Sequence, residues 1–223
     1  MTQFHVIIVA GGSGQRMGAS VPKQFLMLQK KPVLMHTIER FSFAMNGINI
    51  ILVLPENHHT TWNSLVIEHK FQIKHTLSTG GKTRFESVKN GLKLVSNGIV
   101  AVHDGVRPLV SELTIQRCFE TASKLGNAVP VIDVNDSLRI IKEDSNSQAV
   151  DRTKFRIVQT PQCFKVAEMK QAFEQEYSPA FTDCASVMEA AGNIIHLTAG
   201  NTENIKITQP SDLILAEALM KDY

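Results

Sequence analysis

The chain has 223 residues, 43% of them hydrophobic and 20% charged, which is an ordinary globular composition with enough material for one sizeable core. Its 23 lysines and arginines against 21 aspartates and glutamates give a formal net charge of +2, which excludes a strongly basic nucleic-acid-binding protein. No apolar run reaches the roughly 18 residues of a membrane span, no signal peptide opens the sequence, and the cysteines form no CxxC pair, so we expect a cytoplasmic protein without membrane segments, disulfides or a zinc site.

The first predicted element is a strand that runs into a glycine-rich loop. Residues 6–9 are apolar and mostly β-branched, as in a parallel strand buried on both faces. Three glycines follow within four positions, Gly11, Gly12 and Gly14. Their backbone N–H groups can approach anionic oxygens because no Cβ atom intervenes, and Arg16 and Lys23 add two positive charges. The stretch predicts a polyphosphate-binding loop; the alternative, a turn needed only for packing, has no use for the two cations.

Two better-known glycine motifs do not fit. A dinucleotide fingerprint needs a third glycine where Met17 stands, and no strand ending in an acid follows about 20 residues on. Gly80-Gly81-Lys82-Thr83 is similar to the end of a P-loop, but the first glycine of that motif would fall at Thr76. The dinucleotide interpretation is therefore weak, and the P-loop interpretation fails on spacing.

The rest of the first half alternates helix and strand, which predicts an α/β fold with a mostly parallel sheet and helices on both faces. The expected elements are a helix over 32–41, a strand over 48–54, a helix over 60–69, a strand over 73–77, a helix over 83–95 and a strand over 99–103. The last strand delivers Asp104 at its C-terminal end, where ligands bind in open α/β sheets.

The second half contains a segment of different texture. After a helix over 111–125 and a strand over 128–132, two strand-like runs at 137–141 and 155–159 flank a polar middle, and we interpret 133–158 as a two-stranded β-arm. Because an isolated hairpin is marginally stable in water, the arm is expected to rest on a second copy of the chain. We then expect helices over 167–177 and 182–192, strands over 193–198 and 205–207, and a last helix from Ser211-Asp212, all within a single domain over 1–223.

Three charged residues are candidates for chemistry. Asp104 suits a hard divalent ion such as Mg²⁺, which takes carboxylate, phosphate and water oxygens; a turn aspartate paired with Arg107 is the alternative. Lys206, between two isoleucines, either serves the site or points to solvent by strand alternation. Arg152 by itself is better explained as surface charge. Phosphate-binding groups, cations and one acid together indicate nucleotidyl transfer, in which positioning and charge stabilisation do most of the work.

With these motifs in place, the chain resembles the 2-C-methyl-D-erythritol 4-phosphate cytidylyltransferase family over nearly its whole length. The matching motifs are residues 10–18, 22–26, 32–37, Gly80-Gly81 with Arg84 and Ser87-Val88, Val102-His103-Asp104 with Arg107-Pro108, residues 159–162, Thr182-Asp183 with Ala185-Ser186, and residues 204–208. The resemblance implies a Rossmann-like nucleotidyltransferase fold, a β-arm exchanged in a homodimer, and a reaction in the non-mevalonate isoprenoid pathway. In that reaction CTP and the sugar-alcohol phosphate would give the CDP-alcohol and pyrophosphate.

The resemblance also implies roles for individual residues. Arg16 and Lys23 would hold the CTP phosphates and stabilise developing charge, with Arg152 and Lys206 as the other catalytic residues, positioning the sugar phosphate. The implied CTP-binding residues are Ala10, Gly11, Gly12, Gly14, Gly81, Ser87 and Asp104. The implied residues for the second substrate are Arg107, Ser137, Arg152 (from the partner's arm), Thr182 and Lys206. Mg²⁺ would be held by Asp104 and Glu203.

Some positions depart from the family pattern, and a rival remains. Glu203 stands where an aspartate is usual, Cys184 where an acid is common, Gly105-Val106 for two alanines, and Ser137 for a threonine. The ribitol-5-phosphate cytidylyltransferases share the glycine loop, but residues 20–22 lack an additional residue expected there, and Val150-Asp151-Arg152 favours the isoprenoid enzyme. A catalytically silent sugar-nucleotide-binding protein is the alternative of another class; it would have no reason to keep every one of the predicted cations.

Overall fold

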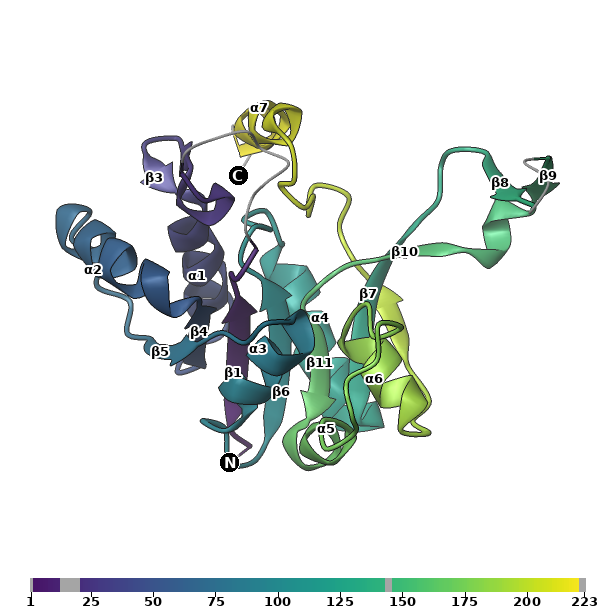
Figure 1. The fold of residues 1–223 in the computed structure, drawn as a ribbon, viewed down its shortest axis with the longest axis horizontal. Helices are drawn as coiled ribbons and strands as arrows, with labels where there is room; N and C mark the ends of the chain where they lie inside the picture. The colour runs from purple at the N-terminus through teal and green to yellow at the C-terminus, as the bar shows by residue number, and fades with distance from the viewer. Residues whose placement is uncertain (1, 13–20, 143–145, 221–223) are drawn as a thin grey trace.

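The computed structural model of the protein describes residues 2–12, 21–142 and 146–220, and its centre is an eight-stranded mixed sheet (Figure 1). The strand order is β10-β7-β11-β6-β1-β4-β5, with β12 on the other side of β7. The bounds are β1 Phe4–Val9, β4 Asn49–Leu54, β5 Thr76–Thr79, β6 Ile99–Asp104, β7 Asn127–Asp133, β10 Arg156–Val158, β11 Gln162–Lys165 and β12 Leu197–Ala199. The central strands β5, β4, β1 and β6 are parallel, so their carboxyl ends meet at one edge.

Helices cover both faces of this sheet. The helices α1 (Val33–Ala44), α2 (His59–Glu68) and α4 (Glu112–Leu125) pack on one face, and α3 (Arg84–Leu92), α5 (Val166–Ala172) and α6 (Cys184–Ala190) on the other. The last helix, α7 (Pro210–Leu219), packs beside the small hairpin of β2 (Met27–Leu28) and β3 (Lys31–Pro32). The predicted α/β class is therefore confirmed. No helix in the described ranges is long and apolar enough to cross a membrane.

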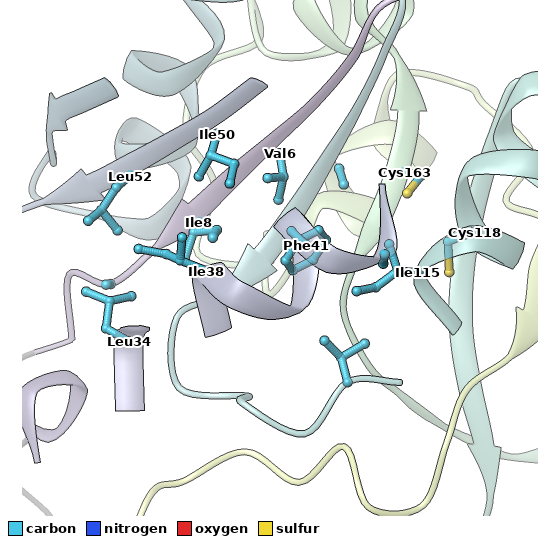
Figure 2. Packing of buried hydrophobic residues seen from close by; sticks show 14 of the residues in the cluster. Val6, Ile8, Leu34, Ile38, Phe41, Ile50, Leu52, Ile115, Cys118 and Cys163 are labelled. Carbon is cyan, nitrogen blue, oxygen red and sulfur yellow. The ribbon is translucent and has the colours of Figure 1, made fainter. Parts of the chain in front are cut away.

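The alternation of side chains along β1 explains why both faces are covered. Val6 and Ile8 point into the cluster with α1 and α4, whereas Ile7 points into the cluster with α3 and α5. Figure 2 shows the first cluster, in which Phe41 of α1 lies among residues of the sheet and Ile115 of α4. Each fully buried apolar side chain of this size stabilises the fold by about 1.5–3 kcal/mol. This packing fixes the end of β1, and with it the loop that follows.

Most predicted elements are confirmed within a few residues, and four differences matter. The strand β11 was not predicted; it lies antiparallel between β6 and β7 and opens at Gln162, directly after the turn at 159–161. Residues 205–207 were predicted as a strand, which is wrong, because they are extended but join no sheet. The helix predicted over 167–177 ends at Ala172, and the strand predicted over 73–77 begins at Thr76.

The β-arm projects far from the body of the molecule (Figure 1), but its strands pair differently from the prediction. Strand β8 (Leu138–Ile141) pairs with β9 (Ser147–Val150), Leu138 opposite Val150. The run at 155–159 does not pair with β8; instead β10 pairs with β7 and continues the main sheet. Strand β9 was not predicted, because Ser147-Gln148 in the polar middle of the arm has little of the β-branched or aromatic character of a strand.

One left-handed glycine ties the start of β6 to β1, and we predict that it cannot be replaced. Gly98 has φ +88°, and a Cβ there would collide with the carbonyl oxygen of Gln3, which accepts a 3.0 Å hydrogen bond from the N–H of Ile99. Gly47 has φ +76° with open space around its Cβ position. Both alanine variants carry the left-handed penalty of roughly 1–2 kcal/mol, so Gly98→Ala should lose at least about 2 kcal/mol more than Gly47→Ala. Urea denaturation measures both; equal losses would contradict the collision.

Candidate active site

A cavity of about 240 Å³ opens at the carboxyl ends of β1 and β6, beside the first turn of α3. This is where ligands bind in open α/β sheets. Eight of the predicted site residues line it: Ala10, Gly11, Gly12, Lys23, Gly81, Ser87, Asp104 and Lys206. They come from four separate stretches of chain, so the structure brings together what the sequence only suggested.

The first wall is the chain that leaves β1. The N–H of Ala10 still donates to Val53 of β4, and Gln24, almost fully buried, donates to the carbonyl of Ala10 at 2.9 Å. These two bonds fix the backbone just before the glycines. A Cβ on Gly12 would lie 3.4 Å from Cε of Lys23, so the lysine stem runs directly along the glycine backbone. The predicted Gly14 and Arg16 lie outside the described residues.

The facing wall is the turn before α3. Thr83 caps this helix by accepting from the N–H of Glu86, and Ser87 Oγ accepts a 3.0 Å bond from the N–H of Gly81 while donating to the carbonyl of Thr83. A Cβ on Gly81 would collide with the side chain of Glu86. Backbone groups of this turn and the Ser87 hydroxyl therefore form part of this wall.

Asp104 at the end of β6 is surrounded by three cations. Its carboxylate lies 3.0 Å from Lys206 Nζ, 3.3 Å from Arg107 Nε and 3.6 Å from Arg84 Nη2. Burial by itself would raise the pKa of Asp104, but the charges of Arg84, Lys206 and Arg107 outweigh it and hold that pKa well below its ordinary value. The aspartate is thus a fixed anion at neutral pH.

A hydrogen-bond chain beneath the cavity holds Asp104 in place. Thr160 Oγ1 accepts from the N–H of Asp104 at 3.1 Å, so its own hydroxyl hydrogen points to Nδ1 of His103 at 3.0 Å. The Nε2–H of His103 then donates to the carbonyl of Arg107 at 3.0 Å. Burial lowers the pKa of His103 to about 4, so the ring stays neutral and completes this chain.

Lys206 reaches the cavity from an extended loop and not from a strand. Asn204 is fully buried; it donates to the carbonyl of Thr160 at 2.8 Å, and its own carbonyl accepts from Arg107 at 2.7 Å. The N–H of Ile207 donates to Val106 at 3.0 Å. Lys206 is therefore positioned by side-chain and backbone hydrogen bonds to the loop after β6, and not by the backbone hydrogen bonds of a strand.

Other predicted residues lie away from the cavity. Arg107 is behind Asp104, bonded to it and to Asn204. Ser137 and Arg152 lie on the arm, where Arg152 donates to the carbonyl of Asn135. Thr182 is exposed on the loop before α6. Within one chain the arm residues and the cavity are separate.

Among the described residues that line the cavity, one carboxylate, that of Asp104, could bind a divalent ion. Asp104 lines the cavity as an anion, whereas the carboxylate of Glu203 accepts bonds from Asn201 and Thr202 and lies outside the wall. The described ranges contain no group of three or more His, Cys, Asp or Glu residues that could hold a metal alone. Because Mg²⁺ commonly takes one carboxylate together with phosphate oxygens and water, Asp104 fits an ion that shares a phosphate ligand.

Four polar or charged cavity residues received no role from the sequence: Gln24, Lys82, Thr83 and Arg84. A signal existed for the last two, because Thr83 three residues before Glu86 is a helix-capping pattern that directs the first turn of α3 to the site. Nothing in the sequence pairs Arg84 with Asp104, which lies far along the chain in another element.

Comparisons with known proteins agree with this geometry. The family model described as 2-C-methyl-D-erythritol 4-phosphate cytidylyltransferase matches residues 4–222. Curated relatives with that name include proteins of Bacteroides thetaiotaomicron, 52% identical with 96% of this chain and 98% of the relative covered, and Clostridium acetobutylicum, 39% identical with 96% of each covered.

Solved structures share the fold. The 2-C-methyl-D-erythritol 4-phosphate cytidylyltransferase of Thermus thermophilus superimposes with a TM-score of 0.80 at 31% identity, covering 99% of this chain and 100% of the other. The 4-diphosphocytidyl-2C-methyl-D-erythritol synthase of Anaerococcus prevotii gives a TM-score of 0.84 at 26% identity, covering 99% and 96%. The predicted nucleotidyltransferase fold is confirmed.

The neutral His103 makes stability depend on pH. The unfolded chain binds a proton near the ordinary histidine pKa of 6.5, which the folded protein does not bind until about pH 4, so the free energy of unfolding should fall as the pH drops through this window. The contribution is of the order of 3 kcal/mol. His103→Gln should flatten the dependence by about that amount. Urea denaturation from pH 7 to pH 4 tests this, because His5 and His36, whose pKa values burial also lowers, contribute to both proteins alike; parallel curves would contradict it.

Proposed function

The chain belongs to the 2-C-methyl-D-erythritol 4-phosphate cytidylyltransferase family, and from that membership we propose that it joins CTP to 2-C-methyl-D-erythritol 4-phosphate. The products are 4-diphosphocytidyl-2-C-methyl-D-erythritol and pyrophosphate, in the non-mevalonate isoprenoid pathway. We assign this activity to one nucleotidyltransferase domain acting in the cytoplasm, where the three free cysteines of the chain suit a reducing environment.

The observation that carries this function is the meeting of two opposite walls in one cavity. On one side the glycine backbone and Lys23 offer positive charge and N–H groups to phosphates. On the other side the turn at Gly81 and Ser87 offers backbone groups and a hydroxyl to a flat ring. We assign the triphosphate to the first wall, together with Arg16 and Gly14, and the cytosine to the second, with Ala10, where a pocket of backbone groups can exclude the larger purines.

The reaction needs positioning and charge more than covalent help. A phosphate oxygen of the sugar-alcohol phosphate attacks the α-phosphorus of CTP; the new O–P bond forms as the bond to the β-phosphate oxygen breaks, and pyrophosphate carries away the electron pair. Lys23 and Arg16 stabilise the charge that builds up on the triphosphate. Lys206, whose side chain is 43% exposed, can turn from Asp104 toward the incoming phosphate.

Asp104 faces the CTP ribose, and it would hold Mg²⁺ together with phosphate oxygens, with Glu203 as a second candidate. When bound, the ion would supply positive charge to the phosphates, in addition to what the lysines provide. Arg107 holds Asp104 from behind. We place Arg107, together with Thr182, on the side of the site that receives the sugar phosphate.

We further propose a homodimer in which each arm completes the site of the partner. The arm exposes Ile140 (55%) and Ile141 (71%), and β10 at its base exposes Ile157 (47%), an apolar surface that a second copy could cover. The hairpin projects into solvent in Figure 1, where its own subunit cannot stabilise it. Arg152 and Ser137 would then reach the sugar phosphate of the partner's site.

We predict that the purified protein with Mg²⁺ releases pyrophosphate from CTP when 2-C-methyl-D-erythritol 4-phosphate is present, and at least about ten times faster than with ribitol 5-phosphate. A coupled pyrophosphate assay at equal concentrations of the two alcohol phosphates measures this. Equal or reversed rates would assign the chain to the ribitol enzymes. No release with either would favour a catalytically silent binding protein.

The exchanged arm makes a separate prediction. Arg152→Ala should weaken use of the sugar phosphate and leave CTP binding nearly intact, whereas Arg139→Ala, which removes an arginine bonded within the hairpin at Ser147, should do neither. At a sugar-phosphate concentration low enough that the Arg152→Ala and Lys206→Met proteins each show little activity, equal amounts of the two, mixed and reassociated, should regain about a quarter of wild-type activity, because half of the dimers then contain one intact site. Absence of recovery would place Arg152 outside the partner's site.

A further inference from the structure

Arg84 is a charged residue in the cavity wall that has no role so far. It is the first residue of α3, directly after the capping Thr83, and its side chain is 28% exposed. The N-terminus of a helix does not by itself favour a cation, because the helix dipole is positive there. An arginine at this position therefore needs partners elsewhere that compensate for its charge.

Two partners hold its guanidinium group. Nη2 lies 3.6 Å from Oδ1 of Asp104 in β6, and Nη1 donates a 3.2 Å hydrogen bond to Sγ of Cys184, the first residue of α6. Cys184 is fully buried and lies 100 positions away in the sequence. Burial raises the pKa of the Cys184 thiol, so at neutral pH it accepts this bond without neutralising the arginine.

Cys184, the partner more distant in the sequence, is itself anchored to the sheet through Gln162. Oε1 of the fully buried Gln162 accepts from the N–H groups of Cys184 and Ala185 at 3.0 and 3.1 Å, and its Nε2 donates to the capping carboxylate of Asp183 at 2.7 Å. Gln162 belongs to β11 and pairs with Val102 of β6, two residues before Asp104. The contacts therefore close a ring that runs from β6 through α3, α6 and β11 and back to β6.

Arg84 and Lys206 both line the cavity and contact Asp104, but the guanidinium group of Arg84 also has a second partner, Cys184. Lys206 has a long flexible stem and a side chain that is 43% exposed, so it can leave Asp104 when substrate enters. Arg84 is hydrogen-bonded to Cys184, and this bond holds it in place when Lys206 moves. After Lys206 turns away, Arg84 still holds Oδ1 of Asp104 while Arg107 holds Oδ2 from behind, so the two arginines together keep the carboxylate in one orientation.

From this ring we propose that Arg84 is a positioning residue for the cytidylyl transfer: it fixes the Asp104 carboxylate that receives the ribose of CTP, and position 184 must supply the hydrogen-bond acceptor that fixes Arg84. This inference rests on the proposed function, which assigns CTP to the cavity. What matters at position 184 is an acceptor and not the chemistry of a thiol, so Cys184→Ser and Cys184→Asp should serve, and Cys184→Ala should not.

Steady-state kinetics of variants test the role of Arg84. Arg84→Met should raise KM for CTP and lower kcat, so that kcat/KM falls about 10- to 100-fold, because the substitution removes one partner of the 3.6 Å ion pair with the buried Asp104. Arg84→Lys, which keeps the charge but cannot reach two partners as a planar fork, should recover little. Arg117→Met is the matched control, because Arg117 also bonds a distant carbonyl, that of Ala199, away from the cavity; it should stay within about twofold of wild type. Arg84→Met with wild-type kcat/KM would overturn the proposal.

A double-mutant cycle separates positioning from general stability. Cys184→Ala should shift KM and kcat in the same direction as Arg84→Met but less, Cys184→Ser and Cys184→Asp should restore at least half of the activity, and Arg84→Met with Cys184→Ala should be no worse than Arg84→Met alone. Cys118→Ala, a buried cysteine in the core on the other face of the sheet, controls for the cost of removing a buried thiol and should leave KM for CTP unchanged. Additive losses, or equal losses for all three Cys184 variants, would overturn the coupling.

Alkylation of Cys184 by a maleimide, read by peptide mass spectrometry on the folded protein, tests the contact without catalysis. Arg84→Met should uncover the thiol and speed its modification at least about tenfold, with Cys118 and Cys163 unchanged. An unchanged rate at Cys184 would overturn the anchoring contact. If wild type forms no product, the proposed function fails, yet the alkylation rates still decide whether Arg84 covers Cys184.

Discussion

Three cations meet one buried carboxylate at the end of β6, and the site is arranged around that cluster. Asp104 would be costly to bury as an isolated charge, so Arg84, Arg107 and Lys206 are as necessary to the fold as they are useful to the site. Each cation comes from a different segment: the first turn of α3, the loop after β6, and the chain before α7. Compensating one charge therefore pulls together three parts of the chain that line or support the cavity.

The sheet makes this convergence possible. Parallel strands β1 and β6 are neighbours with Val9 opposite Asp104, so the glycine loop and the aspartate leave the sheet side by side. The antiparallel β11 then brings Thr160 and Gln162 beneath the same edge, where one supports Asp104 and the other caps α6. A mostly parallel sheet with one reversed strand at its centre thus supplies both the edge to which we assign the phosphates and its supports.

The β-arm differs from the rest of the domain in what can stabilise it. Its hairpin has only four residues in each strand and projects from the body with apolar side chains exposed, so its own subunit offers little to stabilise it. The proposed dimer would cover that surface and deliver Arg152 to a second cavity. Such an arrangement links folding, assembly and substrate selection in one segment, and it explains why residues predicted for one site lie so far apart in a single chain.

The sequence by itself determined the α/β class, the order of most helices and strands, the glycine loop after β1 and the position of Asp104 at a strand end. These features depend on local periodicity, on glycine conformation and on the rule that ligands bind at strand ends. The tertiary structure alone decided which distant residues meet. The antiparallel β11, the pairing of β8 with β9, the extended loop that carries Lys206 and the contact of Arg84 with Cys184 all depend on bonds between residues separated in the chain. Short strands such as Gln162–Lys165 have no periodicity of their own to reveal their partners, and a cation does not show in sequence which buried carboxylate it will neutralise.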